Sequence, residues 1–122
     1  MNDSGLIWVG SKWRNRGRPW NFGQFDSPVL EAVFHLLDTA ELSDEARNSP
    51  VSIVRTISAY ANSLDNDGIL EGRWTAEYPE DCTKPTAWTG SVAIIREYME
   101  KKESVKYGQC WVFSGLTTTL LR

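Results

Sequence analysis

The sequence predicts an α+β fold in which one short N-terminal strand precedes four amphipathic helices. The strand is indicated by an apolar run, Leu6–Val9, that ends at a glycine. The helices are indicated by apolar residues that recur at the 3.6-residue helical period in four separate segments. We expect these helices at about residues 28–38, 50–62, 89–101 and 110–121.

The first two helices have recognisable start signals. A serine followed by a proline stands at Ser27–Pro28 and again at Ser49–Pro50, which suits an N-cap and a first helical position. The predicted buried side of the first helix is formed by Val29, Leu30, Val33, Phe34 and Leu37. That of the second is formed by Ile53, Val54, Ile57, Tyr60, Ala61 and Leu64.

The last two helices show the same apolar period. In the third, the buried positions are Trp88, Val92, Ile95 and Met99. Glu97 and Lys101 are spaced to form an i,i+4 ion pair on its outer side. In the fourth helix, which starts at Cys110, the buried positions are Val112, Phe113, Leu116 and Leu120.

The segments between these elements are polar or irregular. Lys12–Arg18 holds four basic residues and no acidic one, so we expect a solvated surface loop. Pro19–Phe25 holds three aromatic residues around an asparagine and a glycine, which indicates an irregular segment anchored by aromatic packing. Asp38–Asn48 and Thr75–Pro85 are polar connections.

Length and composition limit the possible functions. With 122 residues, the chain is one small domain or a piece of a larger one. Its net charge of -3 gives no electrostatic case for binding a nucleic acid or an anionic membrane. No apolar run reaches the ~18 residues of a membrane span, and the N-terminus does not resemble a signal peptide. We expect a cytoplasmic protein, which could leave the cell only by a route without a signal peptide.

Cys110 is the first candidate for chemistry. It follows the glycine-containing segment Tyr107–Gln109 and begins the predicted last helix, where the helix dipole and free backbone N–H groups favour a thiolate and can receive an oxyanion. The alternative is that Cys110 is a small buried core residue. The other cysteine, Cys82, lies beside Glu80 and Asp81, which disfavour a thiolate. The sequence alone leaves a Cys82–Cys110 disulfide open.

Several motifs together carry a family resemblance. Residues 108–113, GQCWVF, resemble the active-site signature of the animal, calcium-dependent transglutaminases. Further blocks that look like those of the family, in the same order, cover nearly the whole chain: NDSG at 2–5, PWNFGQF at 19–25, Asn62 with DNDG at 65–68, GRW at 72–74 and WTGS at 88–91. The resemblance implies the first, mostly helical half of a papain-like transglutaminase catalytic core.

The resemblance also implies a reaction and roles for its residues. Cys110 would be the nucleophile and a backbone donor to the oxyanion, and would transfer the acyl group of a protein glutamine to a lysine or polyamine. Trp74, 36 positions before Cys110, would donate its indole N–H to the same oxyanion. Trp111 would form an apolar wall that contacts substrate.

A calcium site is the second candidate. Ser63, Asp65, Asp67 and Gly68 match early positions of a calcium loop, but Trp74 stands where an EF-hand needs a glutamate, so we reject an EF-hand. The residues alone favour an ordinary turn at Asp65–Gly68. The family resemblance implies calcium, held by the carbonyls of Ala59 and Leu64 and the side chains of Asn62 and Asn66. Asp65 or Asp67 could add the negative charge that Asn66 lacks.

The catalytic base is not among the matched residues. The only histidine, His35, precedes Cys110, whereas the family's histidine and aspartate follow the cysteine. We therefore expect little or no turnover from this chain alone, with the remainder of a transglutaminase core as its partner. Two alternatives stay open: a papain-like cysteine protease, and a non-catalytic calcium-binding or scaffold module.

Overall fold

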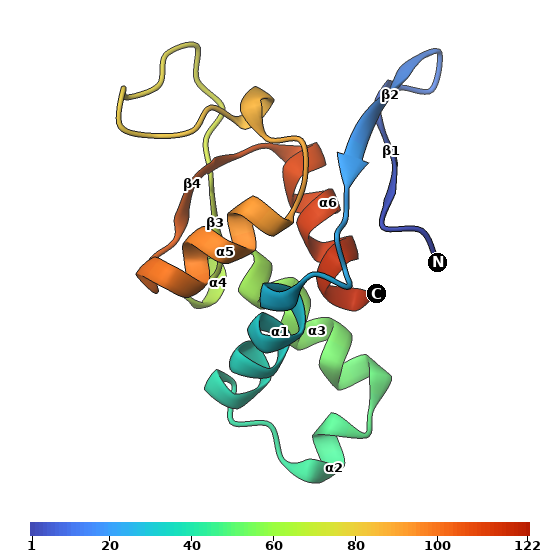
Figure 1. The fold of residues 1–122 in the computed structure, drawn as a ribbon, viewed down its shortest axis with the longest axis vertical. Helices are drawn as coiled ribbons and strands as arrows, with labels where there is room; N and C mark the ends of the chain where they lie inside the picture. The colour runs from blue at the N-terminus through green and yellow to red at the C-terminus, as the bar shows by residue number, and fades with distance from the viewer.

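The computed structural model describes residues 1–122 and contains two small sheets and a group of helices (Figure 1). The strands are β1 (Ser4–Ser11), β2 (Arg14–Asn21), β3 (Leu70–Gly72) and β4 (Val105–Gly108). The helices are α1 (Ser27–Thr39), α2 (Asp44–Arg47), α3 (Pro50–Ala61), α4 (Ser63–Asn66), α5 (Val92–Lys101) and α6 (Cys110–Leu121), with a 3-10 turn at Pro85–Ala87.

The N-terminal sheet is an antiparallel hairpin of β1 and β2. Its register runs from Ser4 opposite Asn21 to Ser11 opposite Arg14. The expected loop at Lys12–Arg18 is therefore wrong, because most of that segment belongs to β2. The pairing with β1 supplies the backbone hydrogen bonds of the segment, whatever the charge of its side chains. The segment expected to be irregular, Pro19–Phe25, likewise begins within β2 and leaves the strand only after Asn21.

The second sheet, a parallel pair of β3 and β4, was not expected. Leu70 lies opposite Val105 and Glu71 opposite Lys106, before an irregularity in register. These strands have three and four residues, too few to show a clear alternation in the sequence. The pair matters for the site because β4 leads directly into α6.

The boundaries of three helices agree with the expected ranges to within one residue. The third helix, expected from residue 89, begins instead at Val92. The residues before it pair with the end of β2: the Asn21 N–H donates to the Thr89 carbonyl (2.9 Å), and the Ser91 N–H donates to the Asn21 carbonyl (3.0 Å). This extended pairing prevents an earlier start. The N-cap of α1 is Asp26 rather than Ser27.

The buried stripes of α1 and α3 are narrower than the apolar pattern suggests. In α1 the buried residues are Val29, Ala32, Leu36 and Leu37, and in α3 they are Ile57 and Ala61. Contrary to expectation, Leu30 and Phe34 are 63% and 53% exposed, and Val54 is 47% exposed. Helix α1 packs on α3, α5 and α6, and α3 packs on α1, α2, α4 and α6, but these contacts leave the three side chains largely uncovered.

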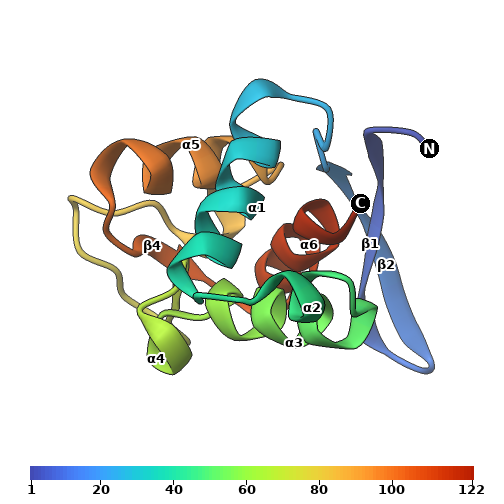
Figure 2. The same cartoon turned by 90° about the horizontal axis from the view of Figure 1, so that it is seen from below.

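Helix α6 is the centre of the core. Figure 2 shows it between α1 and α3 on one side and the hairpin on the other. Val112 and Leu116 are fully buried. Gly115 allows the hairpin to approach, because a Cβ at this position would lie 2.4 Å from the Trp20 ring. No helix combines the length and the apolar character that a membrane crossing requires.

A buried hydroxyl joins three distant segments beside α6. Ser91, at the start of α5, accepts hydrogen bonds from the Trp20 indole (2.9 Å) and from the Thr119 hydroxyl (2.8 Å). Ser91 and Thr119 are the buried polar residues of the core. Because buried polar groups are costly when unpaired, this hydroxyl fixes the relative positions of β2, α5 and α6.

We expect Ser91→Ala to lower the free energy of unfolding by about 1–3 kcal/mol, because the Trp20 indole N–H loses its acceptor. Urea denaturation followed by tryptophan fluorescence measures this change. Ser58→Ala, at an exposed position of α3, is the matched control and should change little. Equal stability of the two variants would contradict a structural role for the Ser91 hydroxyl.

Candidate active site

Cys110 is the first residue of α6 and is exposed, with a free thiol. The carbonyl of Gln109, at the N-cap position, accepts from the N–H groups of Val112 (2.8 Å) and Phe113 (3.1 Å). The N–H groups of Cys110 and Trp111 make no hydrogen bond within the chain. The thiol therefore lies beside free backbone donors at the positive end of a helix, an arrangement that can receive a negatively charged oxygen.

The start of α6 is tied to the segment that follows β3. The Gln109 side-chain amide donates to the Arg73 carbonyl (3.2 Å) and to the Tyr78 hydroxyl oxygen (3.1 Å). In the reverse direction, the Arg73 N–H donates to the Gly108 carbonyl (3.1 Å). These bonds hold the backbone of Arg73 beside Gly108 and Gln109, the two residues that precede Cys110. They therefore also position the backbone of the next residue, Trp74.

The Trp74 side chain packs against the first turn of α6. Its ring stacks on Phe113, with ring centroids 6.4 Å apart and an interplanar angle of 8°. Gly72 permits this position, because a Cβ there would come within 2.6 Å of the Trp74 ring. Trp74 is 65% exposed, so its position depends on this stack rather than on burial. The structure thus brings Trp74 to the helix turn that starts at Cys110.

The thiol borders a hollow of about 270 Å³ whose other wall is β1. The lining residues are Ile7, Trp8, Val9, Gly10, Cys110, Trp111 and Ser114. The sequence did not predict that β1 lines this hollow, because β1 lies about a hundred positions before Cys110 and no motif in β1 indicates a contact with the cysteine. Only the register of the hairpin and its packing on α6 reveal this wall.

The remaining candidates for nucleophile and base lie elsewhere. His35, on α1, packs against Tyr98 of α5, with ring centroids 6.1 Å apart, and does not line the hollow at Cys110. The Cys82 thiol donates to the Pro79 carbonyl (3.0 Å). Both cysteines are free, which settles the question of a disulfide between them.

The residues expected to hold calcium lie where α3 ends and α4 begins. The Asn62 side-chain oxygen accepts from the Leu64 N–H (3.0 Å) and caps α4, while the Asn62 N–H donates to the Ala59 carbonyl (3.3 Å). Leu64 and Asn66 are exposed. The chain contains no cluster of three acidic, histidine or cysteine side chains that could hold a metal ion. The donor set at this loop consists of oxygens, the ligand type that calcium prefers.

Comparison with known proteins shows which proteins this chain is similar to. No family model matched the chain. The whole chain aligns with protein-glutamine gamma-glutamyltransferase K of Mus musculus at 48% identity and with the hemocyte protein-glutamine gamma-glutamyltransferase of Tachypleus tridentatus at 45%. It also aligns over its whole length with the human coagulation factor XIII A chain at 38% identity. Over its whole length, the chain is similar to animal-type transglutaminases.

The fold of a solved transglutaminase supports the same conclusion. The crystal structure of red sea bream transglutaminase matches 99% of this chain with a TM-score of 0.88 and 40% sequence identity, which confirms the expected α+β fold of the core. The chain spans only 15 to 16% of the length of the mouse, horseshoe crab and human relatives named above, and 19% of the sea bream chain. It is thus similar to one segment of these transglutaminases.

Proposed function

We propose that this chain supplies the nucleophile of a protein-glutamine γ-glutamyltransferase. The observation that carries the proposal is an exposed Cys110 at the start of α6, in a chain that aligns over its whole length with proteins named for this activity. The free N–H groups at the helix start and the indole on its first turn support it, because acyl transfer needs donors near the tetrahedral oxyanion.

In the proposed reaction, the Cys110 thiolate attacks the γ-carboxamide carbon of a protein glutamine. The carbonyl oxygen becomes an oxyanion, which the Cys110 N–H and the Trp74 indole N–H stabilise. The amide nitrogen of the intermediate takes up a proton, and collapse of the intermediate then expels ammonia and leaves a thioester. A lysine or polyamine amine then attacks the thioester, loses a proton and releases the thiol. The product is an isopeptide or a γ-glutamyl amide.

The proton transfers require an imidazole that this chain does not place beside Cys110, since His35 lies in the contact between α1 and α5. We therefore propose that the base comes from residues outside these 122, and that the chain alone turns over little or no substrate. Trp111 and Trp74 would serve as apolar walls that favour an amine over water as the acyl acceptor.

The test is the incorporation of a fluorescent primary amine into a glutamine-rich protein, run beside an assay for peptide-bond cleavage. We expect the longer protein that contains this chain to incorporate the amine without cleaving the peptide, and the 122-residue chain to do neither. Cleavage without incorporation would establish the papain-like protease alternative. If the longer protein does neither and Cys110 fails to react with iodoacetamide, the scaffold alternative replaces the proposal.

We also propose that calcium binds at the turn between α3 and β3. The supporting observation is that the expected ligands Ala59, Asn62, Leu64 and Asn66 follow closely along the chain at the end of α3 and in α4, and that Asp65 and Asp67 beside them are exposed. Calcium takes six to eight oxygen ligands. When bound, the ion would supply positive charge that holds this turn in one arrangement. The Asn62 side chain would have to combine this role with capping α4.

We expect Asn62→Ala to weaken calcium binding measurably and to lower stability by about 1 kcal/mol, because the N-cap of α4 is lost with it. Asn62→Asp separates the two effects, since it keeps a capping oxygen and adds a charge that should strengthen binding. Isothermal titration with calcium measures affinity, and Asn48→Ala, at an exposed position outside the turn, is the control. An unchanged isotherm for Asn62→Ala would move the site elsewhere.

The two free cysteines support a reducing compartment, and we propose a cytoplasmic location on that ground.

A further inference from the structure

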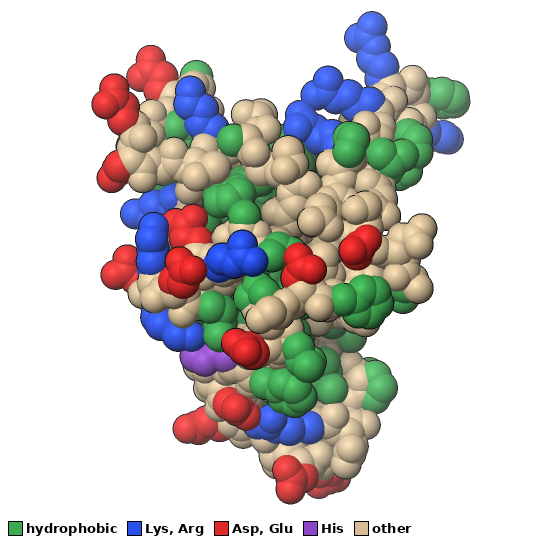
Figure 3. Space-filling model, viewed as in Figure 1, with side chains coloured by type: hydrophobic (Ala, Val, Ile, Leu, Met, Phe, Trp, Pro, Cys, Tyr) green, Lys and Arg blue, Asp and Glu red, His purple; other side chains and the backbone are tan.

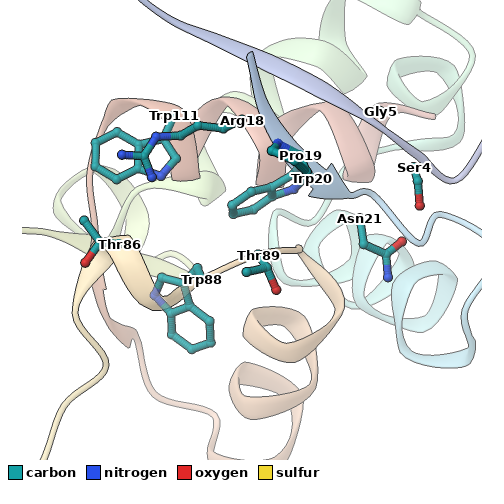
Figure 4. Close-up of a pocket in the computed structure, with 10 residues that line it drawn as sticks. All are labelled: Ser4, Gly5, Arg18, Pro19, Trp20, Asn21, Thr86, Trp88, Thr89 and Trp111. Carbon is teal, nitrogen blue, oxygen red and sulfur yellow. The ribbon is translucent and has the colours of Figure 1, made fainter. Parts of the chain in front are cut away.

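A second hollow shares the Trp111 side chain with the hollow at Cys110. It measures about 440 Å³ and lies where the end of β2, residues 86–89 and the start of α6 meet (Figure 4). Three indole rings and one guanidinium form much of its wall, from Trp20, Trp88, Trp111 and Arg18. Hydroxyl groups come from Ser4, Thr86 and Thr89, and no aspartate or glutamate lines it.

Arg18 lacks an anionic partner within the chain. Figure 4 shows its guanidinium lying across the Trp111 indole, and the guanidinium carbon is 4.3 Å from the ring centroid. The two ion pairs of the structure, Arg47–Asp38 and Lys101–Glu97, do not include it. Its Nε is buried without a hydrogen-bond partner. The charge of the half-buried Arg18 is therefore stabilised by the face of the Trp111 indole and by no carboxylate. The guanidinium N–H groups remain available to a ligand that accepts hydrogen bonds.

Trp111 is the second residue here with an unpaired donor. The side chain is only 8% exposed, and its indole Nε1 is buried without an acceptor. Buried donors in native proteins are almost always paired, so two unpaired ones beside one hollow need an explanation. Both are donors, and Arg18 carries a positive charge. The group that would satisfy them is therefore an acceptor with negative charge.

The charge of the hairpin favours the same kind of ligand. Arg14 and Arg16 share a face of β2 with Arg18, because alternate residues of a strand point to the same side. The sequence has no acidic residue between Ser4 and Phe25. Figure 3 shows Lys and Arg side chains gathered at the far end of the hairpin with no acidic side chain among them. An anionic ligand would thus approach through a positive potential.

We propose that this hollow binds the carboxylate of an aspartate or glutamate that flanks the reactive glutamine in the donor substrate. The proposal rests on the proposed function. Trp111 lines both this hollow and the one beside Cys110, so a single side chain separates them. A peptide whose glutamine reaches the thiol can therefore place a neighbouring side chain against Arg18. Arginine suits this role, because its planar fork can bind both oxygens of a carboxylate.

The experiment measures the binding of two synthetic peptides to the 122-residue chain by isothermal titration. The peptides are identical except for aspartate or asparagine beside the glutamine. We expect the aspartate peptide to bind about tenfold more tightly, the change expected from one charge-assisted hydrogen bond. Arg18→Gln should remove this preference. Arg55→Gln, which makes the same change of charge at an exposed position of α3, should keep it.

Equal binding of the two peptides, or a preference that survives in Arg18→Gln, would overturn the proposal. Because Arg18→Gln could lose the stack on Trp111, its thermal unfolding is measured first. Arg18→Lys gives a second reading, since it keeps the charge without the planar fork and should show a smaller preference than the unmodified chain. Loss of the preference in the longer protein would show that a carboxylate of that protein fills the hollow, which also overturns the assignment to substrate.

The binding measurement separates this proposal from the proposed function. Cys110→Ala in the 122-residue chain should keep the aspartate preference, because the carboxylate does not meet the thiol. If the longer protein incorporates amines but shows no preference, only the carboxylate site is wrong. If the preference is present and no amine is incorporated, the proposed reaction is wrong and the hollow remains an anion-binding site.

Discussion

Replacement of Cys110 by alanine in the longer protein should abolish both thioester formation and amine incorporation. The proposed reaction passes through a covalent bond to this sulfur, and Cys110 is the one thiol that lines this hollow. We expect residual activity at the background level of the assay. Mass spectrometry after incubation with a glutamine peptide, without amine, detects the thioester as a mass increase in the unmodified protein and its absence in the variant.

Cys82→Ala is the matched control for this result. The Cys82 thiol donates to the Pro79 carbonyl and does not line the hollow at Cys110, so its removal should leave amine incorporation unchanged. Amine incorporation that persists in Cys110→Ala would mean that the nucleophile is misassigned. A loss of activity in both variants, with both folded, would point instead to a function that needs the two thiols together.

Replacement of Trp74 should lower turnover more than it lowers substrate affinity. If the indole N–H stabilises the oxyanion, Trp74→Phe removes the donor and should reduce kcat by about 10²- to 10³-fold with little change in KM. Phenylalanine can keep the aromatic stack on Phe113, so this variant isolates the N–H group. Steady-state kinetics of amine incorporation provides both constants.

Trp74→Ala adds the loss of the stack to the loss of the donor. We expect a decrease in kcat at least as large as that of Trp74→Phe, and a greater disturbance of the segment between β3 and Tyr78. Trp13→Phe, at the exposed turn of the hairpin, serves as the control for a general effect of losing an indole. If Trp74→Phe retains full kcat, the ring acts by packing alone and the second oxyanion donor lies elsewhere.

The helices were predictable because each has apolar residues at a regular period and two of the four begin at a proline-containing signal. The strands were harder. We expected a basic loop at Lys12–Arg18, yet Arg14–Arg18 belongs to β2, because it pairs with β1 and such pairing is not visible in the local sequence. The short β3 and β4 have no pattern of their own. Leu30 and Phe34 fit a buried pattern but are exposed, since periodicity does not show which neighbours a helix has.

The candidate site was predictable only in part. Cys110 follows from its place at the start of a helix, and Trp74 from the family resemblance. The contribution of β1 to the hollow and the stacking of Arg18 on Trp111 depend on how the hairpin docks onto α6. Local sequence carries no signal for that docking. Gly115, whose missing side chain makes room for Trp20, is the one residue that could have suggested a close approach.

The wall that β1 provides has a consequence for when the hollow at the thiol forms. β1 and α6 can meet only after α6 has been synthesised, and in the folded structure Arg122 donates to the Asn2 carbonyl (2.8 Å). Until β1 and α6 are in contact, Cys110 is open on the side that β1 covers in the folded chain. In a nascent or partly unfolded chain, the thiol would therefore lack the wall that β1 provides.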